Sequence, residues 1–172
     1  LEVSNKKAQN FAKIEKKFKQ TNTTEPNEIE IRMNKKSTTH LKYQYQDGQT
    51  ILLCKIFYSE QFEAFREACG NKETFIQSLL RCVKWDLKGG KSGLSFLKTL
   101  DNRYILKELS KLELELFVAI APFYFKYMLQ VMFHTLSTSI AKIFGFYQIH
   151  VKNPITGVNT RMDFLVLENL FY

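Results

Sequence analysis

The chain has 172 residues, the length of one ordinary domain, and 45% of them are hydrophobic. This composition excludes a wholly disordered chain, and only seven glycines and three prolines exclude a collagen-like or linker protein. The net charge of +8 favours an anionic partner, which could be nucleic acid, a phosphorylated small molecule or an anionic membrane.

Cysteine usage indicates a reducing compartment. The cysteines are odd in number, widely spaced and without a C-x-x-C pair, which also argues against a structural zinc site: Cys54, Cys69 and Cys82. The N-terminus lacks a signal-sequence pattern. The most apolar stretch, Leu116 to Phe133, contains Pro122 and falls short of the ~20 apolar residues of a membrane span, so we expect a soluble chain.

The first forty residues differ in composition from the rest. Residues 1–20 are typical of a basic helix, with three apolar side chains at helical spacing: Phe11, Ile14 and Phe18. Such a helix could contact a membrane or partner, or could extend the domain. Residues 21–39 are polar and predict a linker. We therefore expect a basic helical segment and linker at 1–40, either continuous or discontinuous with a folded domain at 41–172.

The folded domain begins with a predicted hairpin. Residues 41–46 and 51–58 have strand-like patterns and flank Asp47-Gly48, a dipeptide suited to the positive φ angles of a tight turn. The first arm should be half-buried, with alternate residues facing inward: Leu41, Tyr43 and Tyr45.

Two helices are predicted after this hairpin. Ser59 should cap a helix that runs to about Ala68 and stops at Gly70. A second helix, at about 72–83, should pack through one apolar side: Phe75, Ile76, Leu79 and Leu80.

Two further antiparallel pairs complete the pattern. Strands are predicted at 94–99, 104–109, 141–151 and 161–167. Asp101-Asn102 and residues 153–157 supply the turns. Because βαβ alternation is absent, the simplest architecture is an α+β fold, in which helices pack on one side of an antiparallel sheet.

The longest predicted helix lies between these pairs. Ser110 can cap it, and it should run from Lys111 towards Leu129 with a kink or break at Pro122. Its apolar stripe is expected to face the core: Leu112, Leu116, Ala119 and Ile120.

A glycine-rich segment is the local sequence most indicative of chemistry. Five residues form it: Gly89, Gly90, Lys91, Ser92 and Gly93. Glycines let backbone N–H groups approach an anion closely. The Gly-Lys-Ser tripeptide resembles the end of a Walker A motif, but the first glycine of that motif would fall on Trp85, and a strand follows instead of a helix. An ordinary hairpin turn and the glycine-rich hairpin of protein kinases remain as alternatives.

Residues downstream favour the kinase alternative. Lys107 lies on the predicted strand at 104–109, after the glycine-rich segment. Kinases place a lysine there that neutralises the α- and β-phosphates of ATP. A helix follows with Glu113 and Glu115, either of which could hold that lysine; Glu113 lies beside the apolar face and is preferred. The last strand runs into polar residues, as at the hinge of a kinase small lobe. Such a hinge offers backbone groups to adenine, and here it would consist of Glu168, Asn169 and Leu170.

Five segments, in their order along the chain, resemble the phosphatidylinositol phosphate kinases, most closely the phosphatidylinositol 3-phosphate 5-kinases of the PIKfyve type. The resemblance covers about residues 41–172. It is carried by Trp85 with the glycine-rich segment and by residues 101–107, 121–127, 141–147 and 168–172.

The resemblance implies the small, N-terminal lobe of a lipid kinase. Such an enzyme transfers the γ-phosphate of ATP, with Mg²⁺, to the inositol 5-hydroxyl of phosphatidylinositol 3-phosphate and makes phosphatidylinositol 3,5-bisphosphate. The glycine-rich segment would bind ATP phosphates, Lys107 would pair with them, Glu113 would position Lys107, and residues 168–170 would face adenine. The side chain of Lys91 would either reach phosphate or point into solvent.

The resemblance also implies a location and partners. The enzyme would be cytosolic and peripheral on endosomal or vacuolar membranes that contain phosphatidylinositol 3-phosphate. It would work with the rest of its own kinase, and with a scaffold protein and a lipid phosphatase in a larger complex. The catalytic aspartate, the Mg²⁺ ligands and the activation loop would lie in a large lobe beyond Tyr172, so we expect this polypeptide to be inactive by itself.

Other functions compete with this interpretation. The same domain could be a non-catalytic module that docks a scaffold or regulatory subunit, or it could belong to another phosphatidylinositol phosphate kinase. Nucleic acid is not expected as a partner, because most of the 15 phenylalanines and 8 tyrosines have core spacing rather than alternating with arginine on a surface.

Overall fold

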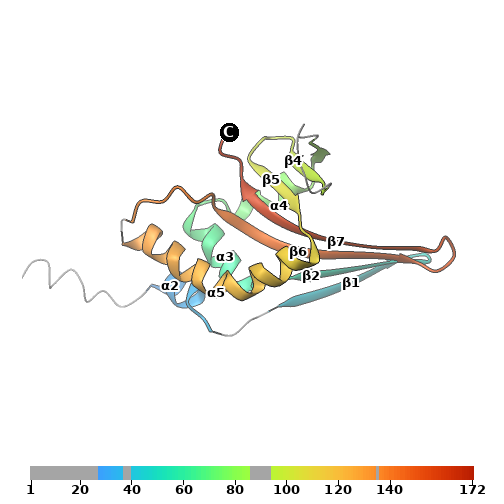
Figure 1. Cartoon of the computed structure of the whole chain (residues 1–172), viewed down its shortest axis with the longest axis horizontal. Helices are drawn as coiled ribbons and strands as arrows, with labels where there is room; N and C mark the ends of the chain where they lie inside the picture. Colours follow the sequence, from blue (N-terminus) through green and yellow to red (C-terminus); the bar gives the residue numbers. More distant parts are fainter. Residues whose placement is uncertain (1–26, 37–39, 86–93, 135) are drawn as a thin grey trace, which may run out of the picture.

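The computed structural model describes residues 27–36, 40–85, 94–134 and 136–172. In these residues a seven-stranded antiparallel sheet has the order β1-β2-β6-β7-β5-β4-β3 (Figure 1). The strands are β1 (Leu41–Asp47), β2 (Thr50–Ile56), β3 (Cys82–Lys84), β4 (Phe96–Thr99), β5 (Tyr104–Glu108), β6 (Ile143–Asn153) and β7 (Val158–Glu168). The helices are α2 (Glu28–Met33), α3 (Ser59–Ala68), α4 (Lys72–Leu79) and α5 (Lys111–Phe133). The predicted α+β class is confirmed.

Three hairpins form where the sequence predicts them: β1–β2, β4–β5 and β6–β7. Each turn contains a residue with positive φ: Gly48 at 55°, Asn102 at 60° and Gly157 at 72°. Glycine and asparagine tolerate this left-handed region better than other residues, so local turn chemistry explains all three reversals.

Helices cover both faces of the sheet, and the prediction of helices on one side is wrong. Lys107 and Phe146 share one face, because both pair with the same residue of β7. On that face α5 packs through Phe117, whose ring centroid lies 5.0 Å from that of Phe146. On the opposite face α4 packs through Phe75, 5.2 Å from the ring of Tyr104. A β-bulge in β6, between Ile143 and Gly145, allows this strand to present aromatic rings to both layers.

The core is largely aromatic. Its buried rings are Phe57, Tyr58, Phe62, Phe65, Phe75, Tyr104, Phe117, Phe125, Phe144 and Phe146. They touch in stacked and edge-to-face pairs, the closest being Phe57 and Phe146 with centroids 4.4 Å apart. Burial of each large side chain stabilises the fold by about 1.5–3 kcal/mol. This core therefore holds α3, α4 and α5 rigidly against the sheet.

Helix α5 starts as the sequence predicts. A capping box closes its first turn: the Ser110 hydroxyl accepts from the N–H of Glu113, and the Glu113 carboxylate accepts from the N–H of Ser110. The helix then continues through Pro122 to Phe133 as one element, so of the predicted kink or break the break is absent.

The buried side of α5 differs from the predicted one. Leu112, Leu116 and Ile120 are 64%, 56% and 54% exposed, and Ala119 is exposed too. The residues that face the core are Phe117, Ala121, Phe125, Met128 and Leu129. The helix is apolar around most of its circumference, and the face with the aromatic rings is the one that packs. By length and composition α5 could cross a membrane, and in the described structure one of its sides packs on the core while the other stays exposed.

A short helix occurs where we expected linker. α2 has its own capping box, formed by Asn27 and Glu30, and Met33 at its end is 1% exposed. It packs beside α3, where Arg32 forms ion pairs with Glu63 and Glu67. The Asn-x-x-Glu spacing is the sequence signal for this helix start.

Strand β1 is exposed along its whole length, so the half-buried strand predicted there is wrong. It is the edge of the sheet, and its hairpin extends beyond the helices (Figure 1). Its alternation of apolar and polar residues is real, but no described element covers either face.

The boundaries of α3 and α4 also differ from expectation. Ser59 is the first helical residue of α3 instead of its cap, and Tyr58 occupies the cap position with a φ of 49°. Gly70, at a φ of 69°, follows the end of the helix as predicted. α4 stops at Leu79, and Ile76 and Leu80 are exposed instead of packing inward.

Candidate functional site

The structure brings Lys107 and Glu113 together. Lys107 points from β5 to the first turn of α5, and its Nζ lies 2.7 Å from Oε1 of Glu113. The other carboxylate oxygen accepts from the N–H of Ser110 at 2.8 Å and from its hydroxyl at 3.0 Å. The capping box thus fixes the carboxylate, and the carboxylate in turn orients the lysine.

This environment lowers the pKa of Glu113 from 4.5 to about 2. The hydrogen bond from Lys107 is the largest cause, and those from Ser110 add to it. The carboxylate is therefore ionised at neutral pH. Both side chains stay about one third exposed, so the Lys107 ammonium, held by one carboxylate oxygen, remains accessible to another anion.

The alternative partner, Glu115, points elsewhere. It is 59% exposed and lies 4.0 Å from Lys111, one turn before it on the surface of α5. The sequence allowed either Glu113 or Glu115 as the partner of Lys107, and in the structure Lys107 forms an ion pair with Glu113.

A pocket lies on the same sheet face as Lys107, towards the C-terminus. It has a volume of about 380 Å³ and is lined by Trp85, Lys98, Asn102, Asn169, Phe171 and Tyr172. Strand register places it: Lys98 pairs with Ile105, two residues before Lys107 on the same face. The Lys98 ammonium lies 5.6 Å from the centroid of the Trp85 ring.

Three residues of this pocket were not predicted from the sequence: Lys98, Phe171 and Tyr172. Motif spacing could not identify Lys98, because its position depends on pairing between β4 and β5. Its alternation with Phe96, which pairs directly with Lys107, was the available signal.

The predicted hinge residues are tied into the protein. The carboxylate of Glu168 accepts from the Lys142 N–H at 2.7 Å and from its ammonium at 2.9 Å, and the Glu168 N–H donates to the Lys142 carbonyl at 2.8 Å. The N–H of Asn169 donates to the Arg103 carbonyl at 2.9 Å. These bonds use the N–H groups of Glu168 and Asn169, whereas Leu170 is 66% exposed.

The glycine-rich segment, Gly89 to Gly93 with Lys91 and Ser92, lies outside the described residues. Its flanks are described: the Trp85 N–H donates to the Phe96 carbonyl at 2.8 Å, so β3 and β4 are paired at the point where this segment joins them.

Lys107 offers a positioned cation on this face and Lys98 a second one, so the face suits an anionic ligand. In the described part of the chain, no three His, Cys, Asp or Glu side chains are grouped as a metal site.

Comparison with known proteins gives a consistent result. The family model described as "Phosphatidylinositol-4-phosphate 5-Kinase" matches residues 79–172. The 1-phosphatidylinositol 3-phosphate 5-kinase FAB1 of Saccharomyces cerevisiae is 56% identical over 154 residues, 89% of this chain. FAB1A of Arabidopsis thaliana, a 1-phosphatidylinositol-3-phosphate 5-kinase, is 46% identical over 117 residues, 67% of the chain. The human 1-phosphatidylinositol 3-phosphate 5-kinase is 38% identical over 135 residues, 77% of the chain.

The chain spans a small part of these relatives: 7% of the yeast and Arabidopsis proteins and 6% of the human one. The matched family region begins at the end of α4 and contains β3, Lys107, α5 and the predicted hinge.

Proposed function

Because the chain belongs to the phosphatidylinositol-4-phosphate 5-kinase family, we propose that it forms the ATP-binding small lobe of a phosphatidylinositol 3-phosphate 5-kinase. The complete enzyme would transfer the γ-phosphate of ATP to the inositol 5-hydroxyl and make phosphatidylinositol 3,5-bisphosphate. The relatives' names support this substrate, since those compared above are phosphatidylinositol 3-phosphate 5-kinases.

The observation that carries the proposal is the Lys107–Glu113 pair. A lysine held by a helix carboxylate on a strand that follows a glycine-rich connection is the arrangement with which kinases neutralise ATP phosphates. Lys107 would bind the α- and β-phosphates, and Glu113 would position its ammonium. Gly89 to Gly93 would cover the phosphates from the β3–β4 connection.

The base of the nucleotide would occupy the pocket beside the hinge. Trp85 offers an aromatic surface there, and Lys98 is a cation on the same face as Lys107. Among the hinge residues, Leu170 is left to contact adenine through its backbone, because the N–H groups of the two residues before it are already bonded.

The remaining parts of the reaction would come from outside this chain. Mg²⁺ bound to ATP would neutralise charge on the transferred phosphoryl group. We place its ligands and the catalytic aspartate in a large lobe elsewhere in the protein, and we propose that the 172-residue chain alone does not transfer phosphate. The lipid substrate would bring the enzyme to endosomal or vacuolar membranes, with a scaffold protein and a lipid phosphatase as partners.

The test is Lys107→Met in the complete enzyme, with Lys111→Met as the matched control. Lys111 is 87% exposed and four residues away. We expect the first variant to lose at least ~100-fold in lipid phosphorylation while keeping its melting temperature, and the control to retain activity. Retained activity in Lys107→Met would refute the proposed role.

The lipid is tested separately with vesicles that contain either phosphatidylinositol 3-phosphate or phosphatidylinositol 4-phosphate. Faster phosphorylation of the 3-phosphate, with label at the 5-hydroxyl, is expected. A preference for the 4-phosphate would assign the protein to another phosphatidylinositol phosphate kinase. If Lys107→Met keeps full cellular function without phosphorylation of either lipid, the domain is a non-catalytic docking module.

A further inference from the structure

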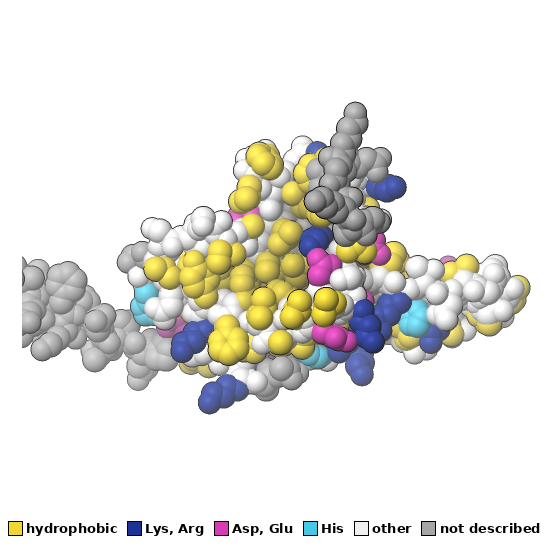
Figure 2. Space-filling view, in the orientation of Figure 1, with side chains coloured by type: hydrophobic (Ala, Val, Ile, Leu, Met, Phe, Trp, Pro, Cys, Tyr) yellow, Lys and Arg dark blue, Asp and Glu magenta, His cyan; other side chains and the backbone are white. Residues whose placement is uncertain are grey.

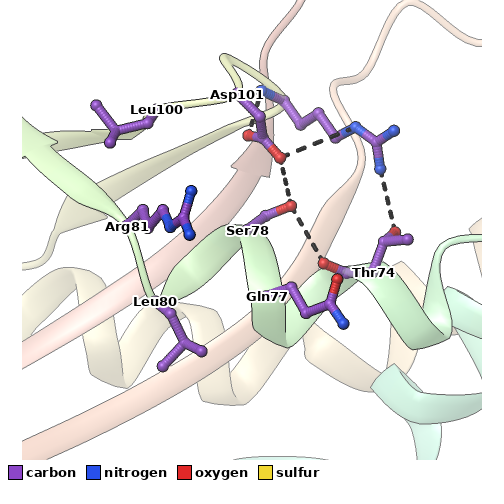
Figure 3. Close-up of a pocket in the computed structure, with 8 residues that line it drawn as sticks. Thr74, Gln77, Ser78, Leu80, Arg81, Leu100 and Asp101 are labelled. Atoms are coloured by element: carbon purple, nitrogen blue, oxygen red, sulfur yellow. Dashed lines mark hydrogen bonds and ion pairs between the residues drawn. The ribbon is translucent and has the colours of Figure 1, made fainter.

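The face of the sheet opposite Lys107 carries a second cavity, formed by α4 and the β4–β5 turn (Figure 3). It is open and has a volume of about 650 Å³. Eight residues line it: Thr74, Gln77, Ser78, Leu80, Arg81, Leu100, Asp101 and Arg103. The phosphoryl transfer proposed above uses none of these side chains.

The floor of this cavity is held by Asp101. Its carboxylate accepts from the hydroxyls of Ser78 at 2.5 Å and Thr99 at 2.6 Å, and from the N–H of Arg103 at 3.2 Å. Burial alone would raise the pKa of Asp101, but these hydrogen bonds outweigh it and the pKa is lowered. Asp101 is therefore a charged group whose lone pairs are occupied in fixing the turn to α4.

The charges that line the cavity do not balance. Arg103 compensates Asp101, because its Nε lies 3.9 Å from that carboxylate and its Nη1 donates to the hydroxyl of Thr74 at 3.1 Å. Arg81 extends beside Ser78, and no hydrogen bond or ion pair joins its guanidinium to the other residues drawn in Figure 3. The lining thus has one guanidinium in excess, with five N–H donors suited to a carboxylate or phosphate.

Two leucines also line the cavity, one on each side of Arg81 in Figure 3. Leu80 is 78% exposed and Leu100 is 58% exposed, so both have apolar area that a ligand could bury. Exposed apolar side chains mark interaction sites, and together with a guanidinium they suit a peptide segment that combines an anionic group with apolar residues. A membrane surface is less suited to the cavity, because polybasic clusters bind anionic lipids, and this concave site has one uncompensated cation.

We propose that this cavity binds a segment of a partner protein in which an anionic side chain lies beside leucine-like residues. The anionic group forms a bidentate hydrogen bond with Arg81, and the apolar neighbours cover Leu80 and Leu100. Aspartate, glutamate and phosphoserine share this chemistry. The site is on the sheet face away from Lys107, and it adjoins the pocket beside the hinge at the β4–β5 turn, where the Arg103 guanidinium lies 5.9 Å from the centroid of the Tyr172 ring.

The test uses fluorescence anisotropy with three labelled pentapeptides and the complete protein. Each peptide has two leucines that flank a central aspartate, phosphoserine or asparagine. We expect the two anionic peptides to bind, the asparagine peptide to bind at least ~10-fold more weakly, and the ratio of the first two to identify carboxylate or phosphate as the preferred group.

Variants locate the site. Arg81→Glu should weaken binding of the anionic peptides at least ~10-fold, Arg81→Lys should retain part of it, and Leu100→Asp should weaken it too. Lys42→Glu, on exposed β1, is the charge-matched control and should bind as wild type. Unchanged melting temperatures would show that these exposed substitutions leave the fold intact.

Three results would overturn the proposal. They are the absence of binding by both anionic peptides, equal binding by the Arg81→Glu variant, and binding to phosphatidylserine vesicles that depends on Arg81 while peptide binding does not. The last result would make the cavity a lipid site instead.

Discussion

Two lysine–glutamate pairs connect neighbouring elements of the sheet, and they differ in what holds them. Lys107–Glu113 and Lys142–Glu168 have similar N–O distances, 2.7 and 2.9 Å, and all four side chains are partly exposed. At Lys142–Glu168 the backbones are joined as well, because each residue's N–H donates to the other residue. At Lys107–Glu113 only the two side chains are joined.

This difference separates a structural brace from a positioned cation. The Glu168 carboxylate, at the end of β7, accepts from the backbone N–H and the ammonium of Lys142, just before β6. It therefore joins the two strands next to the hinge. The Lys107 ammonium lies on the same sheet face as α5, stays about one third exposed, and depends on a carboxylate that the helix cap has fixed. Figure 2 shows that this side, over α5, also carries a broad hydrophobic area.

Among the variants that distinguish the two pairs, Glu113→Ala should have the largest effect on activity. We expect lipid phosphorylation by the complete enzyme to fall by about 10–100-fold, because Lys107 loses its orientation. The free energy of unfolding should fall by about 1–2 kcal/mol, since the capping box is lost and the partly exposed ion pair adds little. Steady-state kinetics and urea unfolding measure the two effects.

Glu115→Ala is the control for this variant, because Glu115 lies on the same turn and is 59% exposed. It should change neither activity nor stability noticeably. Equal losses in the two variants would mean that helix stability matters and that orientation of Lys107 does not.

Glu168→Ala should show the opposite balance. Its removal leaves the Lys142 N–H without its acceptor, so the free energy of unfolding should fall by about 1–2 kcal/mol. The KM for ATP should change by less than about 3-fold, because the carboxylate points to Lys142. A large rise in KM with unchanged stability would contradict this expectation and give the Glu168 carboxylate a part in nucleotide binding.

The smallest effect is a pH dependence of the Glu113 pair. Because its pKa is depressed in the folded state, the stabilisation is present above the ordinary value of 4.5 and is lost as the pH falls towards 2. The difference in unfolding free energy between wild type and Glu113→Gln should therefore be constant above about pH 5.5 and shrink below about pH 4.5. A difference that stays constant down to pH 2.5 would contradict the assigned pKa.

Local chemistry made part of this molecule predictable. Gly48, Asn102 and Gly157 carry the backbone angles that turns require, and Ser110 with Glu113 forms a capping box that depends on four consecutive residues. The pairing of Lys107 with Glu113 follows from the same box, since it places the carboxylate at the start of the helix, next to the end of β5.

Properties that depend on distant residues were not predictable in this way. Helix α5 is apolar on several sides, so its sequence does not specify whether Leu116 or Phe117 faces the core. The alternation in β1 describes two strand faces but does not reveal that both are exposed. Lys98 joins the candidate site only through the register of β4 with β5.

The most direct test of the account is affinity labelling of the complete enzyme with an acyl-phosphate derivative of ATP, which acylates the lysine beside the bound phosphates. Mass spectrometry should find acylated Lys107, protected by excess ATP and lost in a Lys107→Met variant. ATP-protected labelling at Lys142, with Lys107 unmodified or unprotected, would contradict the proposed nucleotide site.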